Sequence, residues 1–133
     1  MNRSEAADHC SRIVELIGMQ GREHAKVGTY SKGMVQRFGL GAALMGNPKL
    51  LILDEPTAGL DPIGIRELRQ LLESLKGQGM TIFLNSHLLS EVEKICDTAA
   101  IINRGKLLVK DTISAIVKDG DTLEDVFVRL VKG

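Results

Sequence analysis

The 133-residue sequence is poor in aromatic side chains: it has no tryptophan, one tyrosine and three phenylalanines. Proteins that hold single-stranded nucleic acid stack the bases on aromatic rings, and here such a platform is missing. Basic and acidic residues number 17 each, so no net charge would attract nucleic acid or an anionic membrane. We therefore expect no nucleic-acid partner.

Long hydrophobic runs are also missing, because the apolar stretches are no longer than a strand and a membrane span needs about 20 residues. The dispersed charges near the amino terminus do not form a signal peptide. Cys10 and Cys96 have no C-x-x-C spacing, which argues against a zinc or redox site and predicts two buried, reduced thiols. We expect a soluble, cytoplasmic chain with at most one core.

The most informative stretch is residues 50–61, Leu-Leu-Ile-Leu-Asp-Glu-Pro-Thr-Ala-Gly-Leu-Asp. Four successive aliphatic residues predict a strand that is buried on both faces of a parallel sheet, and Pro56 ends it. Asp54 and Glu55 follow the strand at once. In open α/β sheets, ligands bind beyond the carboxyl ends of the strands, so this acid pair is a candidate site.

Periodicity and capping residues predict the other elements. The helix that Ser31 caps should bury a stripe of apolar residues: Met34, Val35, Phe38, Ala42 and Met45. A helix that Asp61 caps joins the first strand to the next, which implies a right-handed crossover and a parallel sheet. The expected helices cover 2–17, 31–45, 61–77, a segment after His87, 112–118 and 122–132; the expected strands cover 50–53, 80–84, 98–102 and 106–109. Residues 21–29 should form a loop, and Asn103-Arg104-Gly105 should turn a hairpin that closes one edge of the sheet.

Three segments together resemble the ATP-binding cassette (ABC) family of transport ATPases. Tyr30 to Arg37 is similar to the family's signature motif, residues 50–61 to its Walker B motif and D-loop, and Asn85-Ser86-His87 to its switch-histidine loop. The resemblance implies an α/β, P-loop NTPase-like parallel sheet and ATP with Mg²⁺ as cofactors. It also implies that residues 1–47 are part of a helical subdomain and residues 48–133 the carboxyl-terminal half of the ATPase core.

The carboxylates of the motif suit phosphoryl transfer, which requires positioning and charge. Asp54 is the candidate magnesium residue, because a hard cation prefers carboxylate oxygen, and Glu55 is the candidate general base. On the resemblance, His87 would contact the terminal phosphate. Asp61 can cap a helix and, in the family, also reaches across a dimer interface.

The signature motif would act on a second domain. Ser31, Lys32, Gly33 and Met34 open a helix whose free N–H groups suit a phosphate, and the resemblance places there the ATP that a second nucleotide-binding domain holds. Hydrolysis would then need a head-to-tail pair. The motif departs from the usual pattern, with Lys32 where glycine is common and Met34 where glutamine is common.

The P-loop, G-x-x-x-x-G-K-[ST], is missing from these 133 residues. Gly105-Lys106 is the one Gly-Lys pair, and Leu107 follows it. We therefore interpret the chain as the carboxyl-terminal half of an ATP-hydrolysing transporter subunit, of exporter type, whose partners are the missing amino-terminal half and a membrane-spanning subunit.

Two alternatives remain. The chain could be a non-catalytic interaction or dimerisation module, which the missing P-loop favours. It could also belong to a repair or structural-maintenance ATPase, but those proteins carry long heptad helices, and the predicted helix over 2–17 is short and lacks that repeat.

Overall fold

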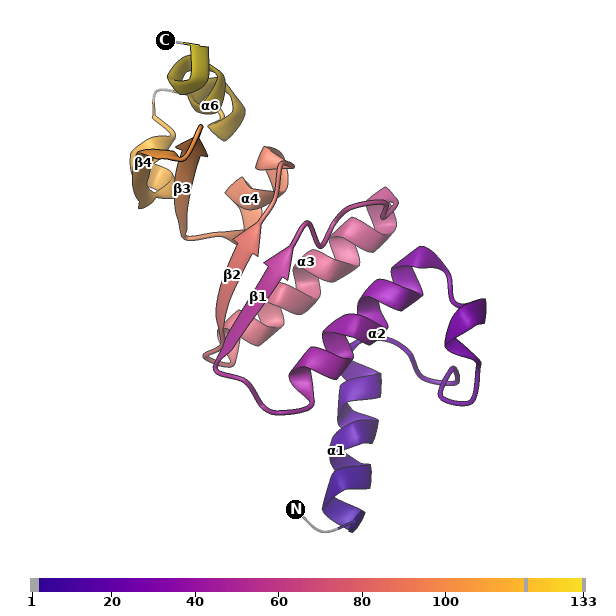
Figure 1. Ribbon diagram of the computed structural model, residues 1–133. Helices are drawn as coiled ribbons and strands as arrows, with labels where there is room; N and C mark the ends of the chain where they lie inside the picture. The colour runs from indigo at the N-terminus through magenta and orange to yellow at the C-terminus, as the bar shows by residue number, and fades with distance from the viewer. Residues whose placement is uncertain (1–2, 119, 133) are drawn as a thin grey trace. The chain divides into compact units, whose positions relative to one another are not determined.

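The computed structural model describes residues 3–118 and 120–132 of an α/β protein (Figure 1). Contacts divide the chain into two units, Met1–Asn85 and Ser86–Gly133. No helix among the described residues has the length and apolar character that a bilayer crossing requires.

The first unit contains two parallel strands, β1 (Leu50–Asp54) and β2 (Thr81–Asn85). Helix α3 (Pro62–Gly77) connects them, as the strand–helix–strand pattern predicted. Asp61 begins this helix, since its Oδ1 accepts a hydrogen bond of 2.7 Å from the Gly64 N–H, and proline at the first position needs no partner for an N–H. The predicted parallel sheet is confirmed.

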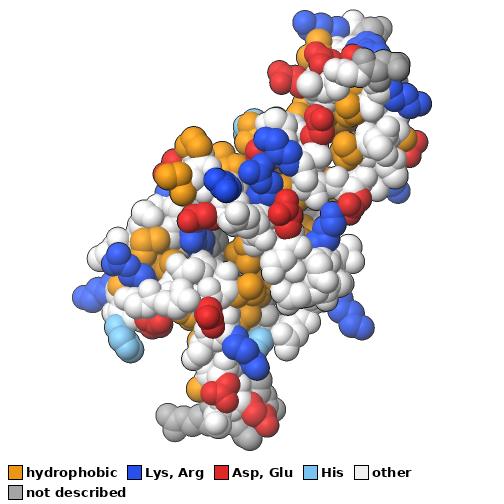
Figure 2. Space-filling model, turned by 180° about the vertical axis from the view of Figure 1, so that it is seen from behind, with side chains coloured by type: hydrophobic (Ala, Val, Ile, Leu, Met, Phe, Trp, Pro, Cys, Tyr) orange, Lys and Arg blue, Asp and Glu red, His pale blue; other side chains and the backbone are white. Residues whose placement is uncertain are grey.

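One face of this sheet lies open, so the prediction that β1 is buried on both faces is wrong. Leu51 is buried, whereas Leu50 and Ile52 are 51% and 68% exposed, and Phe83 of β2 is 62% exposed. Ile52 and Phe83 are partners in the register and therefore share a face. The reason is that α3 covers the other face, and no described residue of this unit buries the Ile52 side. Figure 2 shows that hydrophobic side chains also reach the surface on one side of the molecule.

Helices α1 (Arg3–Leu16) and α2 (Lys32–Leu44) form the other part of the first unit. The predicted buried stripe on α2 is wrong: Val35, Phe38 and Met45 are exposed, and α2 instead buries Leu40, Gly41 and Leu44. Gly41 explains the difference. A Cβ at Gly41 would lie 2.6 Å from Ile17 Cδ1, so the bare glycine lets the end of α1 pack closely against α2.

Several smaller predictions have mixed outcomes. Gly18 has a φ of +64° just after α1, in the left-handed conformation that ends helices. The expected loop 21–29 contains a 3₁₀ turn, Val27–Thr29. Cys10 is exposed and Cys96 is half-buried, so the two thiols are not both buried as predicted. Asn2, the predicted capping residue of the first helix, lies outside the described residues.

The second unit packs helices against a hairpin. It contains, in order, α4 (Leu89–Ile95), β3 (Thr98–Asn103), β4 (Lys106–Thr112), α5 (Ile113–Ile116) and α6 (Leu123–Lys132). The strands are antiparallel, and Arg104 and Gly105 have φ values of +48° and +75°, which suit a two-residue hairpin turn. The predicted hairpin is confirmed, although β4 is longer than expected. The prediction that it closes one edge of the parallel sheet is wrong, because β3 and β4 form a two-stranded sheet of their own. The core cluster contains Ile101, Ile116, Leu123 and Val126.

Candidate functional site

The acid pair lies at the carboxyl end of β1, where sheet topology predicts a ligand site. Asp54 is the last residue of the strand and is exposed, and its register partner on β2 is Asn85. The Asn85 side-chain amide donates a hydrogen bond of 2.7 Å to Asp54 Oδ1. Because residues 50, 52 and 54 alternate with the buried positions, Asp54 projects from the same open face as Ile52.

Glu55 has an unusual backbone conformation. Its φ is +47°, in the left-handed region that non-glycine residues seldom adopt and that costs them about 1–2 kcal/mol. The Glu55 N–H donates a hydrogen bond of 2.8 Å to the Asn85 carbonyl, which fixes the turn. Its Oε2 atom is buried. Strain of this kind concentrates at functional sites.

The residues at this end of the sheet fit a magnesium ion that takes only one or two of its ligands from the protein. Mg²⁺ usually binds one or two carboxylates and takes its remaining ligands from water and phosphate oxygens. In the described parts of the chain, no three His, Cys, Asp or Glu side chains converge as a metal site. Asp54 could therefore hold the ion only together with water and a phosphate ligand.

The signature residues gather at a second place in the first unit. Ser31, Lys32, Gly33 and Met34 line a hollow of about 410 Å³ together with Asp61. Ser31 caps α2, since its Oγ accepts a hydrogen bond of 3.2 Å from the Met34 N–H. All five residues singled out from the signature and D-loop thus share one surface of this unit.

Two residues of α2 connect this helix to neighbouring segments of the unit. The Gln36 side-chain amide donates to the Pro56 carbonyl, and Arg37 pairs with Glu67 of α3. Behind them lies a larger cavity of about 560 Å³ between α2 and α3, which Asp54 also lines. Gln36 Oε1 is buried and has no hydrogen-bond partner among the described residues.

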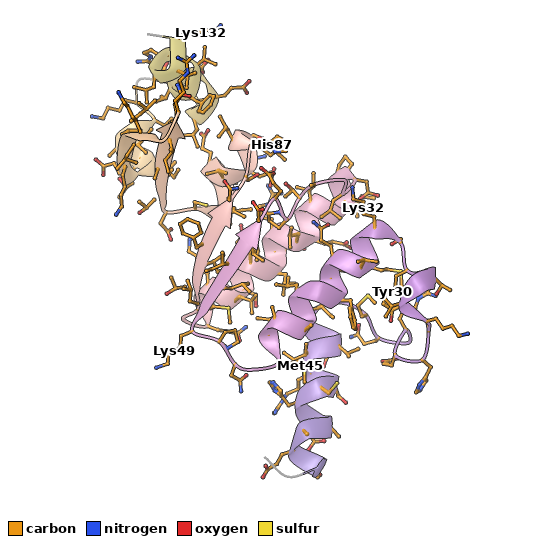
Figure 3. The ribbon with its side chains drawn as sticks, in the orientation of Figure 1. Tyr30, Lys32, Met45, Lys49, His87 and Lys132 are labelled. Atoms are coloured by element: carbon orange, nitrogen blue, oxygen red, sulfur yellow. The ribbon has the colours of Figure 1, made fainter. Side chains whose placement is uncertain are left out.

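His87 belongs to the second unit. It is exposed, two residues beyond the end of β2, and its carbonyl accepts a hydrogen bond of 3.1 Å from Leu89 N–H. Ser86 Oγ accepts a hydrogen bond of 3.1 Å from Leu88 N–H, which forms the turn into α4. Figure 3 labels His87 just before α4.

Comparison with known proteins identifies the family of the chain. A sequence profile described as ABC transporter matches residues 2–58. The bacitracin transport ATP-binding protein BcrA of Bacillus licheniformis is 53% identical over 97 residues, which are 72% of this chain and 32% of that protein. The uncharacterised ABC transporter ATP-binding protein YhcH of Bacillus subtilis (strain 168) is 46% identical over 124 residues, which are 92% of this chain. The chain belongs to the ABC transporter ATP-binding family.

Solved structures show the ABC fold for nearly the whole chain. The structure described as the ATP binding subunit of an ABC transporter superposes with a TM-score of 0.83 and 28% identity, and covers 98% of this chain and 56% of that one. The fold is therefore that of the P-loop NTPases, as the motifs implied. The chain spans 41% of the length of YhcH and 48% of SrtF of Streptococcus pyogenes, a lantibiotic transport ATP-binding protein with 44% identity.

ABC ATP-binding domains bind ATP, which makes ATP the expected ligand of these residues. The role of each single residue stays a prediction. The contacts of Asn85 and Gln36 were not predicted from the sequence. The position of Asn85 beside Asp54 was predictable, because each is the fifth residue of its strand and the two strands are parallel and in register. Gln36 gave no such signal, since its partner is a backbone carbonyl 20 residues away.

Proposed function

We propose that this chain is the carboxyl-terminal half of an ATP-hydrolysing subunit that powers an ABC exporter. One observation carries the proposal: Asp54 and Asn85 project from the same open sheet face as Ile52 and Phe83. Parallel sheets are normally covered on both faces. A half that carries the P-loop would cover the apolar part of this face and bring its phosphate-binding amides to Asp54.

The acid pair would divide the chemistry. When bound, the magnesium ion supplies positive charge that meets the phosphate oxygens during transfer. Asp54 would hold that ion through its Oδ2 side, since Asn85 occupies Oδ1. Glu55 would accept the proton of the attacking water, a contribution of about 10²- to 10⁴-fold. The Glu55 N–H bond to Asn85 would hold the base in its strained position.

The hollow at the start of α2 would serve a second nucleotide-binding domain. Ser31, Gly33 and the flanking Lys32 and Met34 would contact the phosphates of ATP that the partner domain holds, and Asp61 would lie at the same interface. We assign His87 the contact with the terminal phosphate on the family resemblance. The transporter's membrane-spanning subunit would hold the whole assembly at the cytoplasmic side of the membrane. Relatives named for bacitracin and lantibiotic transport support the exporter class.

A second candidate function is a non-catalytic interaction module. It is favoured by the missing G-x-x-x-x-G-K-[ST] run, without which these residues have no cradle for the β and γ phosphates. In that case the open sheet face and the α2 hollow would bind protein partners only.

Mixing the chain with a P-loop-bearing amino-terminal half distinguishes the two functions. We expect ATP hydrolysis in the mixture and none with either half alone, and we expect Asp54→Ala to abolish it. A mixture that forms a stable complex but never hydrolyses ATP would favour the non-catalytic module.

A further inference from the structure

Lys32 folds onto the loop that follows the acid pair. If Gly59 carried a Cβ, that atom would meet the end of the Lys32 side chain: Nζ would be its nearest neighbour, followed by Cε at 2.5 Å and Cδ at 2.8 Å. The neighbouring Gly33 lies close to the same loop, since a Cβ there would be 3.4 Å from Leu60 Cδ2. In Figure 3, Lys32 lies where the start of α2 meets the loop that leads into α3. Residues 32 and 33 therefore contact residues 59 and 60.

Helix stability does not account for a lysine at this position. Lys32 is the first residue of α2, and a cation there faces the positive end of the helix dipole. The end of its side chain has a clear role instead, because Nζ and the two methylenes next to it all lie on the surface of the loop. The surface here is Gly59, whose φ of +74° and bare Cα provide the space.

The loop beneath Lys32 is a tight, hydrogen-bonded turn. Ala58 N–H donates to the Glu55 carbonyl at 3.0 Å, and Leu60 N–H donates to the Thr57 carbonyl at 3.1 Å. The turn starts at the strained Glu55 and ends next to Asp61. A side chain that covers the turn is therefore placed to fix where both carboxylates stand.

We propose that Lys32 is a positioning residue, whose side chain packs on Gly59 and holds the loop from Glu55 to Asp61 against the first turn of α2. Its consequence for hydrolysis rests on the function proposed above, whereas the contact itself does not. Lysine in place of the usual signature glycine thus joins the two segments that would face the second domain.

Hydrogen exchange in the 133-residue chain tests the contact without ATP. We expect Lys32→Ala to speed exchange of the Leu60 amide by about fourfold for each methylene that loses its contact. Lys32→Met keeps the aliphatic reach without the charge and should stay within about twofold of the native chain. Unchanged exchange in Lys32→Ala would overturn the proposal, and so would equal acceleration in Lys32→Met, which would make the ammonium responsible.

A matched pair of glycines provides a second test. Gly59 and Gly79 both have positive φ, +74° and +88°, but nothing lies within 4 Å of a Cβ at Gly79. Gly59→Ala should therefore lower Tm more than Gly79→Ala, and adding Lys32→Ala should remove the excess. An excess that persists in the double variant would contradict the contact.

Turnover in the mixed halves separates positioning from stability. We expect Lys32→Ala to lower kcat by roughly ten- to a hundredfold, since a misplacement of about 1 Å can cost 10²-fold. Lys32→Met should recover most of the loss. If the native halves do not hydrolyse ATP while the exchange results hold, the proposed function fails and the Lys32 contact stands. If hydrolysis proceeds and Lys32→Ala matches the native kcat, Lys32 does not position the site.

Discussion

Ile52 should contribute little to the stability of this chain and much to its assembly with a P-loop half. Its side chain is 68% exposed on the open sheet face. Burying a whole isoleucine side chain is worth about 1.5–3 kcal/mol, so covering the exposed two thirds would contribute about 1–2 kcal/mol. Ile52→Thr keeps the branched Cβ that strands favour while removing most of this apolar surface.

The substitution should weaken binding of the amino-terminal half by roughly 5- to 30-fold in Kd, since 1.4 kcal/mol is tenfold. Isothermal titration of the two halves measures this effect. The free energy of unfolding of the chain alone should change by no more than about 0.5 kcal/mol, as is usual for surface positions. Phe83, 62% exposed beside it, should add a similar loss when it is also replaced.

Ile63 offers a matched control. It is 69% exposed but lies in the first turn of α3 and not on the sheet. Ile63→Thr should leave Kd for the amino-terminal half unchanged. If Ile52→Thr and Ile63→Thr bind equally well, or if Ile52→Thr unfolds the chain, the open face is not the docking surface.

Three further predictions concern single positions. In the mixed halves, Glu55→Gln should leave ATP binding intact and reduce turnover at least about 10²-fold, because only the proton acceptor is lost; near-native turnover would remove Glu55 from the base role. Gly41→Val should destabilise the chain by about 1–3 kcal/mol in urea unfolding, since α1 packs on that position, whereas Gly39→Val on the same helix meets nothing within 4 Å and should cost less. Hydrogen bonds from the Thr122 hydroxyl and N–H lower the pKa of Asp125. The stability that they contribute at the start of α6 is therefore present above the ordinary aspartate pKa and is lost as the pH falls through the lowered pKa. An NMR shift of the Thr122 amide that follows an ordinary aspartate titration would refute this.

Local chemistry made much of the fold predictable. Asp61-Pro62 placed the start of α3, Asn103-Arg104-Gly105 placed the hairpin, and the run 50–53 placed β1. Each signal acts within a few residues of itself. The parallel pairing followed as well, because a strand, a helix and a strand allow few connections.

Packing between elements was less predictable. The stripe expected on α2 was chosen from apolar residues at helical spacing, but α1 packs where Gly41 has no side chain, so a different face of the helix is buried. Burial of β1 on both faces was expected from its uninterrupted apolar run. In the structure only one face of this strand is covered by described residues of the first unit, and the other face is exposed.

The candidate site, too, has a part that was predictable from the sequence and a part that was not. The motifs located Asp54, Glu55, Ser31 and Asp61 along the chain, because these depend on short runs of residues. Contacts between distant segments, such as Lys32 with Gly59, follow from the geometry of a whole unit and appear only in three dimensions.

Binding of Mg-ATP to the 133-residue chain, measured with and without a P-loop-bearing amino-terminal half, tests the central claim most directly. The claim is that this chain supplies carboxylates to a nucleotide that another segment must cradle. We expect no binding to the chain alone, and binding once the halves are mixed. Binding to the chain alone that Asp54→Ala abolishes would contradict the claim, because a complete site would then form without a P-loop.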